Sequence, residues 1–107
     1  MNLNSASIFA DIPKQLSEEL CQNLFSKPNV RIERIISKGQ HSPKDFWYDQ
    51  NQDEWILLVQ GHARLELFAT GMLELVAGDY LLIPAHCKHR VDWTDSLTET
   101  IWLAIYL

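Results

Sequence analysis

The chain has 107 residues, of which 47% are hydrophobic and 21% are charged, and its formal net charge is −5. This length corresponds to one domain, and this composition is that of a folded globular protein rather than a disordered chain. The acidic charge argues against nucleic acid and anionic membranes as partners. It favours a small molecule as the ligand.

The cellular setting is predicted from cysteine content and apolar runs. Cys21 and Cys87 are the only cysteines, too few for the disulfide framework of a small secreted protein. The N-terminal residues lack the basic and apolar regions of a signal peptide. The longest apolar runs, such as Trp55 to Val59, are too short to cross a bilayer. We therefore expect a cytoplasmic protein with reduced thiols.

Residues 1–29 are predicted to form an N-terminal arm with a short helix. Leu16, Leu20 and Leu24 recur every four residues, which suits one face of an amphipathic helix. Ser17 precedes two glutamates, as is common where a helix begins. The SKPN sequence that follows would end the helix.

From residue 30 onward the hydrophobic pattern changes to a period of two, which is typical of strands. In HARLELF, residues 62–68, Ala63, Leu65 and Leu67 alternate with polar side chains. Similar short runs, separated by turn sequences, continue to the end of the chain. Seven or eight short strands of this kind indicate an all-β sandwich or barrel over residues 30–107.

The last predicted strand, residues 100–107, is apolar on both faces. The sequence alternates between two apolar sets, Ile101, Leu103, Ile105 and Leu107 on one side and Trp102, Ala104 and Tyr106 on the other. One set is expected to fill the barrel. The other needs a cover, which is either the arm or a second subunit. We expect a homodimer.

Two stretches resemble the signatures of the cupins. GDYLLIPAHCKH resembles the second cupin signature, in which a Gly, a Pro and a metal-binding His fall where this chain has Gly78, Pro84 and His89. EWILLVQG resembles the end of the first signature, with Glu54 and Gly61 at the expected spacing.

The resemblance is closest to small single-domain cupins of the conserved-barrel type that carry an FWYDQ…DEW stretch. It extends over residues 30–107 and implies a jelly-roll barrel, also called a double-stranded β-helix. His86 lies at the turn position that cupins usually fill with Gly. It is interpreted as a turn residue with positive φ, with metal ligation as the alternative.

The metal signature is incomplete. Metal-binding cupins carry His-x-His upstream of the Glu, and this chain has no histidine there. Counting back from Glu54 assigns Trp47 and Asp49 to the two positions. Counting forward from Gly39, the glycine that opens the first signature, assigns Asp45 and Trp47 instead. Asp49, Glu54 and His89 remain as candidate ligands for a divalent ion such as Zn, Mn, Fe or Ni. The alternative is a metal-free barrel with a hydrogen bond between Glu54 and His89.

Three aromatic residues are candidates for contact with a ligand. Trp47 and Tyr48 lie beside the predicted pocket strand, and Trp93 follows His89 by four residues. Small-molecule pockets are largely apolar and aromatic, although single rings of this kind often pack in a core or at a dimer seam. Trp47 is expected to point inward, because it appears in both ways of counting.

Three functions remain open at this point. The first is a cupin that binds or senses a small molecule, with or without a metal ion. The second is a metal-dependent enzyme, either isomerase-like or oxygenase-like. The third is a metal-free structural or interaction module. Fold alone does not distinguish them.

Overall fold

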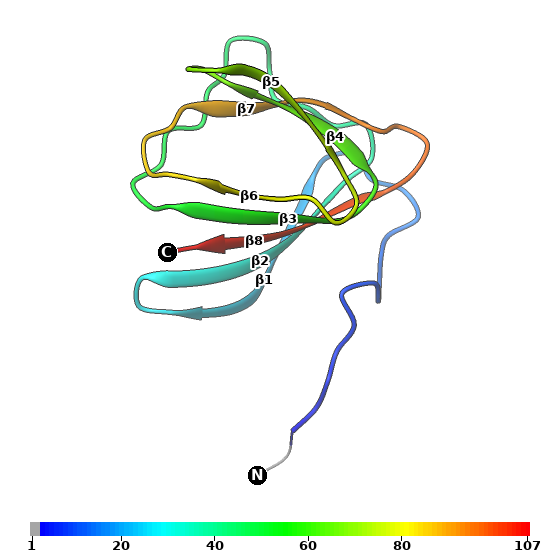
Figure 1. Cartoon of the computed structure of the whole chain (residues 1–107). Helices are drawn as coiled ribbons and strands as arrows, with labels where there is room; N and C mark the ends of the chain where they lie inside the picture. The colour runs from blue at the N-terminus through cyan, green and yellow to red at the C-terminus, as the bar shows by residue number, and fades with distance from the viewer. Residues whose placement is uncertain (1–2) are drawn as a thin grey trace.

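The computed structural model describes residues 3–107. Eight strands form in this part of the chain: β1 (Leu20–Lys27), β2 (Val30–Ser37), β3 (Glu54–Gln60), β4 (His62–Leu67), β5 (Gly71–Val76), β6 (Tyr80–Ile83), β7 (His89–Thr94) and β8 (Thr100–Tyr106). Figure 1 shows two sheets facing each other around a common interior. The five-stranded sheet has the order β1-β2-β8-β3-β6, and the three-stranded sheet has the order β5-β4-β7. All pairings are antiparallel.

The predicted all-β fold is confirmed, and the core lies between the two sheets. Alternation along the strands directs one set of side chains inward. In β4, Ala63 and Leu65 are buried as expected. The core consists of side chains from both sheets: Ile56, Leu58, Ala63, Leu65, Leu75, Ile83, Trp102, Ala104 and Tyr106.

Strand β8 lies inside the five-stranded sheet, between β2 and β3 (Figure 1). Its Trp102, Ala104 and Tyr106 belong to the core, so one face of this strand fills the barrel as predicted. Leu103 and Ile105 alternate with them and are only partly buried. The outer face of the sheet therefore exposes part of its apolar surface.

The predicted helix in the N-terminal arm is wrong. Residues 3–107 contain no helix; Leu20 and Leu24 belong to β1, which pairs with β2, and Leu16 lies before this strand. An isolated short helix is marginally stable in water, whereas pairing satisfies the backbone groups along the edge of β2. Pro28 and Asn29, part of the predicted helix stop, form the two-residue turn between these strands, and Asn29 has φ 68°. Consistent with the absence of helix, no described segment has the length and apolarity of a membrane-crossing helix.

The long connection between β2 and β3 covers the edge of β7. The backbone N–H of Ser42 donates to the carbonyl oxygen of Val91 at 2.8 Å. Tyr48 and His89 exchange two backbone hydrogen bonds, at 2.7 and 3.1 Å. The buried guanidinium of Arg90 donates to the Ser42 carbonyl oxygen at 2.9 Å and so fixes the connection. This pairing brings the residues just before β3 against the strand that carries His89.

Candidate functional site

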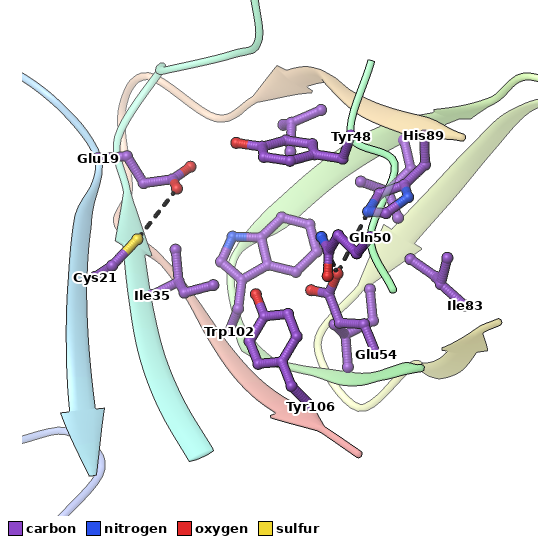
Figure 2. Close-up of a pocket in the computed structure, with 13 residues that line it drawn as sticks. Glu19, Cys21, Ile35, Tyr48, Gln50, Glu54, Ile83, His89, Trp102 and Tyr106 are labelled. Atoms are coloured by element: carbon purple, nitrogen blue, oxygen red, sulfur yellow. Dashed lines mark hydrogen bonds and ion pairs between the residues drawn. The ribbon is translucent and has the colours of Figure 1, made fainter. Parts of the chain in front are cut away.

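A cavity of about 140 Å³ lies between the two sheets at one end of the barrel. Figure 2 shows side chains from both sheets and from the β2–β3 connection converging on it. Apolar and aromatic side chains form most of its wall, and the lining residues are Glu19, Cys21, Ile35, Tyr48, Gln50, Glu54, Ile56, Leu65, Ile83, His89, Val91, Trp102 and Tyr106. A cavity of this size exceeds what one water molecule needs. A mostly apolar wall with a few polar groups is typical of small-molecule sites.

Glu54 and His89 meet at one end of this cavity, as the two signatures predicted. Glu54 begins β3 and His89 begins β7. His89 Nε2 lies 3.3 Å from Glu54 Oε1, and the two residues are 6% and 8% exposed respectively. A charged hydrogen bond between them compensates for the burial of both groups.

The partner of the second ring nitrogen of His89 shows that this nitrogen carries a proton. Nδ1 lies 2.8 Å from the carbonyl oxygen of Cys87, and a carbonyl can only accept, so Nδ1 carries a proton. Burial works against the charged imidazolium, but the hydrogen bonds to Glu54 and to the Cys87 carbonyl outweigh it, and the pKa of His89 is raised above its ordinary value. The site therefore favours an imidazolium–carboxylate pair.

Tyr48 and Gln50 complete this end of the cavity. The Tyr48 ring stacks on the His89 ring, with 5.5 Å between centroids and 27° between planes. The Gln50 side-chain amide donates to Glu54 Oε1 at 3.3 Å. Tyr48 and Gln50 are two residues apart and both line the cavity. They therefore occupy the place of the His-x-His pair.

The predicted inward direction of Trp47 is wrong. Trp47 does not line the cavity, and its ring packs edge-on against Phe68 at 5.3 Å. The neighbouring Tyr48 forms a β-bridge with His89, and successive side chains of an extended segment point to opposite sides. Counting back was thus displaced by one residue and counting forward by three, and an odd displacement reverses the face of every side chain.

Trp93 also lies outside the cavity. Its ring contacts the His62 ring at 5.0 Å and lies below the Arg64 guanidinium at 5.6 Å. His62 and Arg64 alternate along β4 with the buried Ala63, so this group occupies the outer face of the three-stranded sheet. Trp93 is placed to pack on that surface rather than to contact a ligand in the barrel.

Asp49 turns away from Glu54 and His89. Its carboxylate pairs with His86 Nδ1 at 2.8 Å, at a solvent-exposed position. His86 has φ 63° and donates its backbone N–H to the Gln50 carbonyl oxygen at 2.7 Å. The interpretation of His86 as a turn residue with positive φ is confirmed. The histidine and the aspartate together tie this turn to the β2–β3 connection.

The donor set does not fit a metal centre of the usual cupin kind. Residues 3–107 contain no cluster of three or more His, Cys, Asp and Glu side chains suited to one ion. Glu54 and His89 are together, but the two remaining positions hold Tyr48 and Gln50 in place of imidazoles. A phenol and an amide are poor replacements, and burial raises the pKa of Tyr48, which disfavours the phenolate.

Glu19 and Cys21 line the opposite end of the cavity and were not among the predicted site residues. Cys21 belongs to β1, and its thiol lies 3.5 Å from Glu19 Oε1. Desolvation raises the pKa of Glu19. Desolvation, together with the Glu19 charge, raises the pKa of the Cys21 thiol to about 12. This thiol is therefore protonated and unsuited to act as a nucleophile.

The family follows from comparison of the whole sequence. The model of the family described as "Cupin domain" matches residues 33–106. The chain is a cupin. No match was found among curated proteins.

Solved structures of similar proteins agree with this assignment. The chain is 45% identical to a protein from Ralstonia eutropha JMP134, described as a putative mannose-6-phosphate isomerase, with 97% of each chain covered and a TM-score of 0.93. It is 23% identical to a cupin superfamily protein from Desulfitobacterium hafniense DCB-2, over 90% of this chain and 83% of the other, with a TM-score of 0.74. It is 14% identical to an RmlC-like cupin protein from Desulfovibrio desulfuricans, over 98% and 97%, with a TM-score of 0.75. The last two similarities concern the fold alone.

Proposed function

We propose that this cupin binds a small molecule in the barrel cavity without using a metal ion. The proposal rests on one observation, which is that the cavity wall has polar groups at one end and aromatic surface beside them. Gln50, Glu54 and His89 supply polar groups at one end, while Trp102 and Tyr48 supply ring surface beside them. A polar end fixes the orientation of a ligand, and apolar walls supply most of its binding free energy.

The experiment is a ligand-observed NMR screen of small fragments against the purified protein in the presence of a chelator. Glu54→Gln removes the charge at the polar end while keeping the size of the side chain. Glu74→Gln is the matched control, because its carboxylate is exposed and pairs with His62 on the outer surface. Fragments that bind wild type and the control but not Glu54→Gln support the proposal. A screen without hits, or hits that persist in Glu54→Gln, contradicts it.

Aldose–ketose isomerisation is a second candidate. The description of the Ralstonia eutropha protein suggests this reaction. The Glu54–His89 pair offers a base and an acid at 3.3 Å, and both side chains are buried. Glu54 would take a proton from the carbon beside the carbonyl and return it to the former carbonyl carbon, while His89 would give a proton to the carbonyl oxygen and take back the proton of the neighbouring hydroxyl as that oxygen becomes the new carbonyl.

An assay of mannose 6-phosphate conversion to fructose 6-phosphate in the presence of a chelator tests this candidate. Isomerase activity that Glu54→Gln removes and Glu74→Gln retains would establish it. Wild-type protein without conversion would remove this candidate and leave the binding function in place.

A further inference from the structure

We infer that the cavity selects a small organic cation, such as a quaternary ammonium group, over neutral and anionic molecules of the same shape. This inference rests on the proposed binding function and specifies its ligand class. It follows from the charges and the aromatic rings that face the cavity.

The ionisable groups around the cavity are mostly acidic. Glu19 and Glu54 line its two ends, and Glu33 lies close enough for its charge to raise the pKa of Glu19. The basic groups nearby are already paired. His89 contacts Glu54 at 3.3 Å, and Arg31 contacts Glu33 at 2.9 Å. The opposite charges within each of these two pairs therefore cancel. Glu19 remains as the carboxylate of the cavity wall that no basic group compensates.

The aromatic rings provide the second part of a cation site. Tyr48, Trp102 and Tyr106 all line the cavity, and Figure 2 shows their rings around one space between the two acidic ends. Ring faces carry partial negative charge and attract cations, most strongly where water is excluded. The Arg31 guanidinium already lies 4.1 Å from the centre of the Tyr106 ring. One of these rings therefore engages a cation within the protein itself.

The Glu19 carboxylate has neutral neighbours but no cationic partner in the cavity wall. Among the lining residues drawn in Figure 2, hydrogen bonds and ion pairs join Glu19 to Cys21, Gln50 to Glu54, and Glu54 to His89. The Ser37 hydroxyl also lies beside the Glu19 carboxylate, but among the described residues no basic side chain forms an ion pair with it. An ammonium group placed between the rings and Glu19 would neutralise this carboxylate without displacing a bond of the wall.

Isothermal titration with three probes of one shape tests the inference. Choline carries a trimethylammonium group, 3,3-dimethylbutan-1-ol is its neutral carbon counterpart, and 3,3-dimethylbutanoate is an anionic counterpart. We expect choline to bind at least roughly tenfold more tightly than the alcohol, which corresponds to about 1.4 kcal/mol. The carboxylate should bind most weakly, and added salt should weaken the binding of choline alone.

Two variants locate the effect. Glu19→Gln should reduce the preference for choline over the alcohol by several-fold, whereas Glu74→Gln, which removes an equal charge on the outer surface, should retain the preference. Equal binding of choline and the alcohol would overturn the inference while leaving the proposed function intact, as would tighter binding of the carboxylate. Equal effects of the two variants, or no binding of any probe, would also overturn it. The fragment screen then decides separately whether the cavity binds other molecules.

Discussion

His89 Nε2 lies 3.3 Å from Glu54 Oε1, and this contact joins the two halves of the cupin signature inside the barrel. The two residues begin strands of different sheets, β7 and β3. Their pairing therefore depends on how the sheets pack as well as on local sequence. The contact couples the stability of the barrel to the protonation of one histidine.

The pH dependence of stability follows from this coupling. The pKa of His89 is raised in the folded state. The stabilisation by the pair is therefore fully present below the ordinary histidine pKa of about 6.5, and it is lost as the pH rises through the pKa of the folded state. A charged hydrogen bond contributes about 1.5–3 kcal/mol. Urea denaturation should therefore show that Glu54→Gln lowers the free energy of unfolding by this amount at about pH 6, with a smaller difference at about pH 9. A difference that is constant or grows with pH would contradict the pairing.

The proposed absence of a metal ion from the site predicts that metal binding can be gained by substitution. The Tyr48→His, Gln50→His double variant supplies two imidazoles beside Glu54 and His89, which gives three histidines and a glutamate. We expect Zn²⁺ or Mn²⁺ to raise the melting temperature of this variant by mass action. The wild-type melting temperature should not change with Zn²⁺, Mn²⁺, Fe²⁺ or Ni²⁺. A wild-type increase that a chelator reverses would show that the natural donor set does hold an ion.

Gly61 of the first signature has a steric role that substitution can test. It has φ +99°, and a Cβ there would lie 2.6 Å from Thr100 Cα. Gly71 has φ +98° with no atom within 4 Å of the added carbon, so it is a matched control for the backbone conformation alone. We expect Gly71→Ala to lower the free energy of unfolding by about 1–2 kcal/mol and Gly61→Ala by a further 1–3 kcal/mol or so from overpacking. Equal losses in chemical denaturation would remove the steric explanation.

The outer face of the five-stranded sheet is predicted to form a dimer interface. Leu103 and Ile105 are partly buried at its centre, and Tyr80 and Leu82 of β6 are 64% and 50% exposed. An apolar sheet face of this kind is unusual on a monomer. We expect wild-type protein to be a dimer by light scattering at micromolar concentration, with an interface of more than about 1,000 Å².

Leu103→Glu should shift this dimer to the monomer, because the charge would be buried without a partner. Leu97→Glu is the control, since Leu97 is 86% exposed in the loop between β7 and β8. A monomeric wild type, or a dimer that tolerates Leu103→Glu, would show that this face serves another purpose.

The sequence was sufficient to predict most of the fold but failed in the segment that became β1. The period of two and the turn residues identified β2 to β8 because each of those strands alternates or lies between clear breaks. Leu16, Leu20 and Leu24 misled because a spacing of four is both close to one helical turn and a multiple of the strand period. The segment forms a strand rather than a helix because the edge of β2 is free to pair with it. A local sequence pattern cannot show that such an edge lies nearby.

The site could also be predicted only in part, because motif spacing is a local property of the sequence and strand pairing is not. Glu54 and His89 came from motif spacing and do meet in the cavity. Trp47 was misplaced because one residue of register decides the face, and only the bridge between Tyr48 and His89 fixes that register. Cys21 reaches the cavity through strand pairing, so nothing near it in the sequence indicated a site.

The most direct test of the account follows the indole N–H signals of the four tryptophans during ligand titration. Trp102 lines the cavity, whereas Trp93 packs on the outer face of the other sheet. With a chelator present, choline or 3,3-dimethylbutan-1-ol should shift the Trp102 signal in the ¹H–¹⁵N spectrum saturably and leave the Trp93 signal in place. A Trp102 signal that moves only after a metal ion is added, or that is moved neither by these probes nor by hits of the fragment screen, would contradict metal-free binding in the barrel.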